Sequence, residues 1–194
     1  MKHLVITAHP RAKSFNLSVV AAYTKELEEH GHRVAQRDLY AIGFDPILSA
    51  RDMTAMARGK LPGDIRAELK AIRTADAITI VSPLWWRGFP AILKGYVDRV
   101  FTAGVGYLNT DKNEQKSLSG RIAVIITTSE ATVDELKSNG TLRALKADHK
   151  EMMDYCGIDL VGQIYLGGVS SSMSRTEGEQ HLETIRRFVR RTFR

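Results

Sequence analysis

The stretch AITIVSPLWWRGFP, residues 77–90, is an apolar run that leads into a loop holding both tryptophans of the chain. The part from Ala77 to Val81 carries no charge, which predicts a strand buried on both faces, as in a parallel sheet. Pro90 suits the first turn of a helix. The residues after it form an apolar stripe at helical spacing, made of Leu93, Tyr96, Val97 and Val100. A buried strand followed directly by a helix is the repeating unit of α/β folds.

The same alternation of strand and helix patterns extends in both directions along the chain. Apolar or alternating runs predict further strands at residues 4–8, 33–37 and 122–126 and within residues 158–166. Five strands with intervening helices fit an α/β fold with a doubly wound parallel sheet, helices on both faces and 2-1-3-4-5 as one common strand order. Because no linker or repeat interrupts the pattern, we expect residues 1–194 to form a single domain.

The composition is that of an ordinary globular protein, with 194 residues, 43% of them hydrophobic and 26% charged. The uncharged apolar runs are far too short to span a bilayer. The amino-terminal residues contain no signal-like apolar region, so we expect a cytoplasmic location. Cys156 is the single cysteine, which excludes an intramolecular disulfide and a cysteine-rich metal site. The histidines show no HExxH spacing, and we predict no metal site.

The formal net charge of +6 has two interpretations. A basic surface can attract nucleic acid or phosphate-bearing ligands, and it can equally be a solvated face. Part of the excess lies on one face of a predicted carboxyl-terminal helix, in Arg186, Arg187, Arg190, Arg191 and Arg194. Cations suit the carboxyl end of a helix, where the dipole is negative. Because the sequence shows no recognised binding module, we expect no nucleic-acid partner.

In doubly wound sheets, ligands bind beyond the carboxyl ends of the strands, where the strand order reverses. This rule selects the loops after Ala8, Val81 and Ile126. The first loop, from His9 to Asn16, joins a buried strand to the start of a helix, where free amides and the helix dipole favour an anion. It predicts a phosphate or pyrophosphate site. The alternative is a capped helix preceded by an exposed basic turn.

The second and third loops carry aromatic and hydroxyl side chains. Trp85 and Trp86 follow a buried strand directly, and a large aromatic surface there suits a flat ring. The alternative is a hydrophobic plug that covers the end of the sheet. The third loop begins with hydroxyl groups that can bind a ring edge or a sugar, those of Thr127, Thr128 and Ser129. Thr132 and Glu135 in the same loop form a capping-box pattern, which needs no ligand.

Five motifs run through these loops and their flanks: AHPxxxSFN at 8–16, DLY at 38–40, PLWWxGxPAILKG at 83–95, DRVF at 98–101 and TT at 127–128. In combination they resemble the NAD(P)H:quinone oxidoreductase family of flavodoxin-like flavoproteins. That family includes the ancillary quinone reductases of bacterial potassium-efflux systems. The resemblance covers the chain from its start into the fifth predicted strand, and the PLWW-to-DRVF stretch is its most specific part.

The resemblance implies a bound flavin, with FMN preferred over FAD, and NAD(P)H as co-substrate. The residues implied around the flavin phosphate are His9, Ser14, Phe15 and Asn16. Those along the isoalloxazine ring are Pro83, Leu84, Trp85 and Trp86. Those at its pyrimidine edge are Thr127 and Thr128, which the hydroxyl of Ser129 follows. Family members usually form homodimers, and Tyr107 matches an aromatic position that closes the partner's acceptor pocket beside Trp86.

The implied activity is hydride transfer from NAD(P)H through the flavin to a quinone-like acceptor, with the chemistry carried by the cofactor and no catalytic side chain assigned. The alternatives are a non-enzymatic flavodoxin-like electron carrier and a flavoprotein subunit that docks on a membrane transporter. The chain departs from the family at Ser129 and Glu130, where members commonly have two glycines. It also lacks the Tyr and His that balance charge on reduced flavin in some members. A carboxylate there opposes an anionic flavin, so the charge-balancing group is unassigned.

Overall fold

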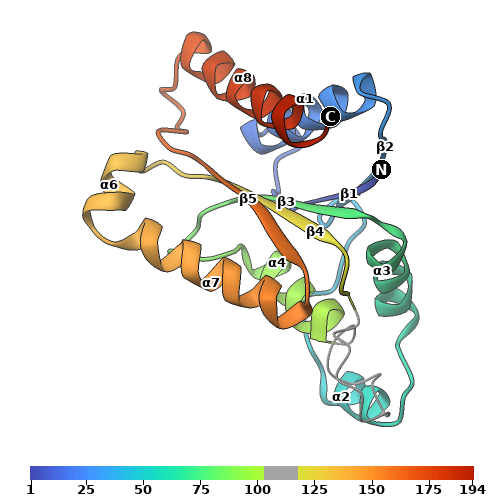
Figure 1. Cartoon of the computed structure of the whole chain (residues 1–194). Coiled ribbons are helices and arrows are strands. Elements are labelled where there is room, and N and C mark those ends of the chain that lie inside the picture. The colour runs from blue at the N-terminus through green and yellow to red at the C-terminus, as the bar shows by residue number, and fades with distance from the viewer. Residues whose placement is uncertain (103–117) are drawn as a thin grey trace.

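The computed structural model describes residues 1–102 and 118–194, and in it five parallel strands form one sheet (Figure 1). Their order is β2-β1-β3-β4-β5, which confirms the predicted doubly wound arrangement. The strands are β1 (Lys2–Thr7), β2 (Arg33–Asp38), β3 (Ala77–Pro83), β4 (Ile122–Thr128) and β5 (Asp159–Leu166). The order reverses between β1 and β3. The connections that follow these two strands therefore lead to opposite faces of the sheet and leave a crevice between them at its carboxyl edge.

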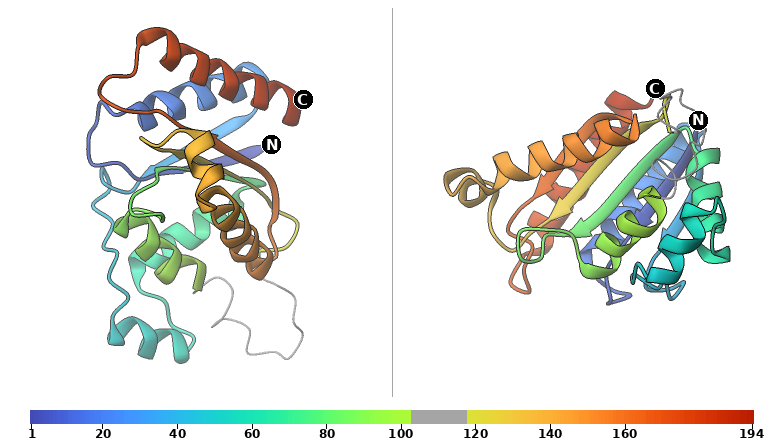
Figure 2. Two further views of the ribbon diagram at one scale, coloured as in Figure 1. Left: turned by 90° about the vertical axis from the view of Figure 1, so that its left-hand side faces the viewer. Right: turned by 90° about the horizontal axis from the view of Figure 1, so that it is seen from below.

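Helices cover both faces of the sheet (Figure 2). They are α1 (Phe15–Glu29), α2 (Ala50–Ala57), α3 (Gly63–Thr74), α4 (Ala91–Tyr96), α6 (Val133–Ser138), α7 (Thr141–Cys156) and α8 (Arg175–Thr192), with a π-helical turn η1 (Val97–Phe101) that continues α4. Helices α1 and α8 pack on one face, over Val5 and Ile126. Helices α3, α4 and α7 pack on the other, over Leu4 and Ile125. Within the described residues, no helix is both long and apolar enough to cross a bilayer.

Capping residues set both ends of α1 and the start of α6. The Ser14 side chain accepts a hydrogen bond from the Leu17 amide and starts α1 directly after the first loop. Gly31, with a φ of 77°, takes the left-handed conformation that ends the helix. Thr132 and Glu135 form the predicted capping box at the start of α6.

The arginine-rich face of α8 has acidic partners within the chain. Arg186 lies 2.7 Å from Glu179 and 3.2 Å from Glu183. Arg190 lies 3.2 Å from Glu26 of α1, so this contact ties the last helix to the first. These ion pairs account for part of the carboxyl-terminal arginine cluster as a solvated face, the second of the two interpretations of the net charge.

Candidate functional site

A cleft of about 390 Å³ opens at the carboxyl edge of the sheet, beyond the ends of β1, β3 and β4. Its lining comes from four separate segments: His9, Arg11, Lys13, Ser14, Phe15, Asn16, Pro83, Leu84, Trp85, Thr128, Ser129, Glu130, Val169, Ser170 and Ser171. The three loops selected from the sequence therefore meet in one place, together with the loop that follows β5. This is where the strand-order rule places a ligand.

One end of the cleft is the amino terminus of α1. The first amides of a helix have no intrahelical acceptor, and the dipole adds partial positive charge. The charged donors are Arg11 and Lys13. The imidazole of His9 accepts a hydrogen bond from the Arg11 amide at 3.1 Å, and burial lowers its pKa, so His9 is neutral near pH 7. This end of the cleft favours an anion through the amides and the two cations.

Another wall of the cleft is apolar and is held to the sheet. The Leu84 amide donates to the Thr128 carbonyl at 2.7 Å, which continues the pairing of β3 with β4 beyond the last strand residue. Trp85 follows, and its ring centre lies 5.8 Å from that of His9. Pro83, Leu84 and Trp85 thus present a continuous apolar surface against which a planar ring can rest.

Thr128 links the two halves of the site. The Asn16 side-chain amide donates to the Thr128 hydroxyl at 3.0 Å, across 112 residues of sequence, and both side chains are buried. Ser14 caps α1, which leaves the side chain of Asn16 free to join the helix to the end of β4.

Ser129 and Glu130, the two positions at which the sequence departs from the family that it resembles, both line the cleft. The Ser129 amide donates to the Leu166 carbonyl at 2.9 Å, and its hydroxyl donates to the Ala131 carbonyl at 2.7 Å. The Ser129 hydroxyl is therefore engaged within its own loop. Glu130 is exposed and places a carboxylate at this rim of the cleft.

Two of the predicted residues that the structure describes, Thr127 and Trp86, do not line the cleft. The side chain of Thr127 lies on the opposite face of the sheet from that of Thr128, because successive strand residues alternate and Thr128 faces α1. Trp86 lies at the tip of a turn and is fully exposed. Tyr107 lies outside the described residues. The remaining predicted residues come together in the cleft.

The sequence interpretation missed the loop after β5, which contributes Val169, Ser170 and Ser171. The Val169 amide donates to the Ser129 carbonyl at 2.8 Å, so this loop packs directly on the third one. A signal was present: the run Gly-Gly-Val-Ser-Ser-Ser at 167–172 follows a strand and has the composition of a ligand-contacting loop. A fourth strand, β5, thus ends at the site in addition to β1, β3 and β4.

The donors of this cleft fit a flavin nucleotide. Its volume lies within the range of about 300–1,000 Å³ that is typical of small-molecule sites. A helix amino terminus with two cations suits a phosphate, and the Pro83-to-Trp85 wall suits the ring. Among the described residues, no cluster of three or more His, Cys, Asp or Glu side chains is arranged to hold a metal ion.

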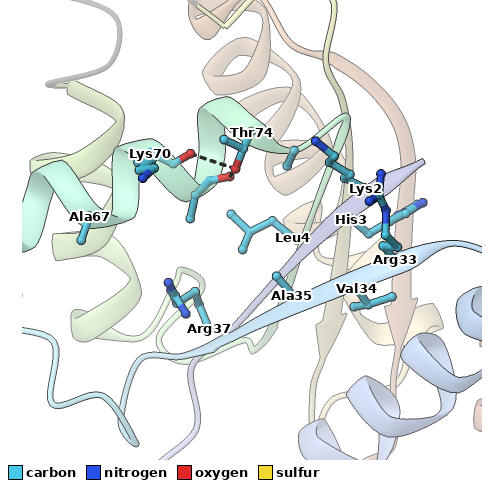
Figure 3. Close-up of a pocket in the computed structure, with 12 residues that line it drawn as sticks. Lys2, His3, Leu4, Arg33, Val34, Ala35, Arg37, Ala67, Lys70 and Thr74 are labelled. Carbon is cyan, nitrogen blue, oxygen red and sulfur yellow. Dashed lines mark hydrogen bonds between the residues drawn. The ribbon is translucent and has the colours of Figure 1, made fainter.

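A second hollow, of about 420 Å³, lies between α3 and strands β1 and β2 (Figure 3). Leu4 and Ala35 form its floor, and Lys70 and Arg37 lie at its border. It reaches Lys2 at the first residue of β1, so it lies toward the amino-terminal end of the strands. No predicted site residue lines it, and doubly wound sheets bind ligands at the other end. The carboxyl-edge cleft is therefore the candidate site.

Comparisons with known proteins agree with this architecture. A family model described as a flavodoxin-like fold matches residues 1–189. An uncharacterized NAD(P)H oxidoreductase of Haemophilus influenzae is 38% identical over 175 residues, which cover 86% of each chain. The NAD(P)H dehydrogenase (quinone) 1 of Cavia porcellus is 35% identical over 139 residues, which span 63% of this chain and 50% of that protein.

A solved structure extends the similarity to three dimensions. The NAD(P)H:quinone oxidoreductase from Methanothermobacter marburgensis superposes with a TM-score of 0.84 at 31% identity, over 96% of this chain and 94% of that one. The strand order, the cleft at the carboxyl edge and these similarities lead to one conclusion. The chain belongs to the flavodoxin-like fold family, within which it is similar to NAD(P)H oxidoreductases.

Proposed function

We propose that this chain is a flavin-dependent NAD(P)H oxidoreductase that reduces a quinone-like acceptor. The observation that carries the proposal is the cleft, which joins an anion-binding helix terminus to an apolar wall at the switch in strand order. The names of the Haemophilus influenzae and Methanothermobacter marburgensis relatives support the same activity. The overall reaction takes NAD(P)H, a proton and a quinone to NAD(P)⁺ and a hydroquinone.

We assign the phosphate to the first loop. The amides of Phe15 and Asn16 start α1, and Arg11 and Lys13 supply positive charge beside them. Ser14 is buried and caps the helix, which orients the amides toward the cleft. We prefer FMN over FAD, because the helix terminus, the two cations and the apolar wall already account for a mononucleotide.

We assign the ring to the wall of Pro83, Leu84 and Trp85, with Thr128 at its polar edge. When bound, the flavin supplies the redox chemistry by accepting hydride from NAD(P)H and passing two electrons to the acceptor. The chain's own residues orient and shield. The Leu84 amide donates to the Thr128 carbonyl, which fixes this part of the wall to the end of β4, and the apolar side chains would exclude water from that face of a bound ring.

The acceptor pocket is completed by Trp86 and by Tyr107 of a second copy, in a homodimer. The fully exposed indole of Trp86 supports this assignment, because a large apolar side chain in water gains from burial against a partner or an acceptor. Analytical ultracentrifugation of the full chain tests the dimer. We further place the protein in the cytoplasm. A pull-down from membranes tests the alternative in which the chain docks on a membrane transporter.

The activity is tested by loading the chain with FMN or FAD, removing free flavin and mixing it anaerobically with NADH or NADPH. We expect loss of the oxidised-flavin absorbance and its return when a soluble benzoquinone is added. Retained flavin that neither nicotinamide bleaches would contradict the proposal. Bleaching only in the presence of a separate reductase would instead indicate the electron-carrier alternative.

A matched pair of charge reversals tests the phosphate assignment. The double variant R11E/K13E places acids at the amino terminus of α1 and should weaken FMN binding more than tenfold, because each reversal replaces attraction with repulsion. The control R187E/R191E makes the same charge change on α8, away from the cleft, and should leave FMN binding unchanged. Equal effects of the two would show that only the net charge matters.

A further inference from the structure

The turn that presents Trp86 has a strained backbone. Trp85 and Gly88 exchange backbone hydrogen bonds of 3.1 and 3.0 Å, which closes a two-residue hairpin turn. Its central residues, Trp86 and Arg87, have φ values of 50° and 63°, and within the described chain they are the non-glycine residues with positive φ. Turns of this kind normally use Asn-Gly, because a Cβ is disfavoured in the left-handed region. Something outside the turn must stabilise this conformation.

The first external contact is made by Arg87. Its guanidinium donates a hydrogen bond to the hydroxyl of Thr141, the first residue of α7 and 54 positions away in sequence. Thr141 is 3% exposed, and its amide is held by the side chain of Asn139 at 3.0 Å. The acceptor for Arg87 is therefore a buried residue at the start of a helix.

The second external contact is made by Phe89, on the other side of the turn. Its ring stacks on that of His149, with ring centres 5.1 Å apart and planes 9° from parallel. His149 is buried on α7 and stacks in turn on Tyr165 of β5, with planes 4° from parallel. Burial lowers the pKa of His149, so its ring is uncharged at pH 7. Helix α7 thus contacts the loop on both sides of Trp86.

Trp85 belongs to both the wall of the cleft and the turn, but the residues on either side of it have separate supports. Leu84 is held by the backbone of β4, whereas Arg87 and Phe89 are held by side chains of α7. A change in α7 can therefore alter the turn without displacing the cofactor wall. The two supports predict separable effects on flavin binding and on acceptor binding.

We propose that Thr141 and His149 are positioning residues that clamp the Trp85–Gly88 turn in its strained conformation and so orient Trp86 toward the acceptor. The part that concerns the acceptor rests on the proposed function. The clamp itself is a property of the folded chain and needs no cofactor. A direct measurement on Trp86 and a kinetic measurement therefore test the two parts separately.

The direct test uses the W85F background, in which Trp86 is the single tryptophan of the full-length chain. Time-resolved fluorescence anisotropy then reports the local motion of Trp86. We expect T141V and H149A each to increase the amplitude of fast motion, since each removes one support. T141S retains the hydroxyl and H149F retains a stacking ring, so both should preserve the slow decay. T184V on α8 is the control for loss of a threonine hydroxyl away from the turn.

The kinetic test uses the flavin-loaded chain with tryptophans intact. T141V should raise KM for a soluble benzoquinone about fivefold, the effect expected from losing one hydrogen bond, with kcat and the FMN dissociation constant unchanged. T141S should restore KM. Unchanged Trp86 motion in both T141V and H149A would overturn the clamp, whether or not the protein reduces quinones. Altered motion in a chain without reductase activity would support the clamp and contradict the proposed function alone.

Discussion

Thr127 and Thr128 are neighbours in sequence, yet their hydroxyl groups have different surroundings. The Thr128 hydroxyl accepts a hydrogen bond from the Asn16 side-chain amide at 3.0 Å, and both residues line the cleft. The Thr127 hydroxyl is buried on the other face of the sheet and has no hydrogen-bond partner among the described residues. A pattern of two threonines after a strand cannot reveal this difference, because the pleat decides which one faces a ligand.

Substitution of each threonine by valine should therefore have opposite outcomes. T127V replaces an unpartnered hydroxyl with a methyl group of similar size, so we expect the free energy of unfolding to be unchanged or higher. T128V leaves the Asn16 amide unpaired in a buried position, which should cost about 1–3 kcal/mol and weaken FMN binding. Urea denaturation and flavin titration measure both. Equal destabilisation by the two variants would contradict the assigned faces.

His3 gives the fold a pH dependence. It is 2% exposed, and burial, with contributions from His32 and the amino terminus, lowers its pKa from 6.5 to about 4. Between these two values the unfolded chain binds a proton that the folded chain does not, so stability is full above pH 6.5 and falls as the pH drops toward 4. The difference corresponds to about 3 kcal/mol at most.

Denaturation of the wild type and of H3F across this range tests the contribution of His3. Phenylalanine keeps a ring against Phe193, whose centre lies 4.8 Å from that of His3, and it cannot take up a proton. We expect the decline in unfolding free energy between pH 6.5 and 4 to be shallower in H3F. Parallel curves for the two proteins would show that other groups cause the decline.

At the scale of elements, helix α4 packs closely on the chain that precedes α2. Gly95 lies in the helix, and a Cβ built there would overlap the backbone of Pro46. The sequence shows only a glycine inside a helical stripe, which usually weakens a helix. The close approach explains why a glycine occupies this helical position, since no side chain fits between α4 and the segment at Pro46.

Replacing Gly95 with alanine should accordingly destabilise the fold by about 1–3 kcal/mol, as overpacking does, even though alanine favours helices. Gly63, at the start of α3, has nothing within 4 Å of an added Cβ. The matched G63A variant should be neutral or stabilising by up to about 1 kcal/mol. Thermal unfolding of both variants checks the contrast, and a stabilised G95A would show that the close contact is absent in solution.

At the scale of the whole molecule, the cleft is assembled from segments that lie far apart in the chain. Its lining comes from residues 9–16, 83–85, 128–130 and 169–171. No segment forms the site alone, so a ligand that bridges them binds the folded chain and not the unfolded one. Ligand binding must then stabilise the fold by mass action.

FMN at about 100 times its dissociation constant should raise the unfolding free energy by about 2.7 kcal/mol. Riboflavin has the same ring and no phosphate, so at equal concentration it should stabilise less if the α1 terminus binds the phosphate. Differential scanning fluorimetry with both ligands gives the comparison. Equal stabilisation by FMN and riboflavin would remove the phosphate assignment while leaving the ring assignment intact.

The strand order, the two helical layers and the meeting of three loops at one edge were all predictable from the sequence. Apolar periodicity, capping residues and turn formers act between near neighbours, and for an alternating strand–helix chain they leave few topologies open. The motif at residues 83–95 added the expectation of a flavin, because with the other motifs it resembles the NAD(P)H:quinone oxidoreductase family of flavoproteins.

Only the tertiary structure decided which threonine faces the cleft, that the loop after β5 belongs to it, and that Trp86 and Arg87 adopt left-handed conformations. Each depends on contacts between residues far apart in sequence: Asn16 with Thr128, Val169 with Ser129, and Arg87 with Thr141. The local sequence even opposes the left-handed conformations of Trp86 and Arg87, since tryptophan and arginine disfavour positive φ. Packing against α7 supplies the energy that overrides the local preference, and packing is a property of the assembled fold.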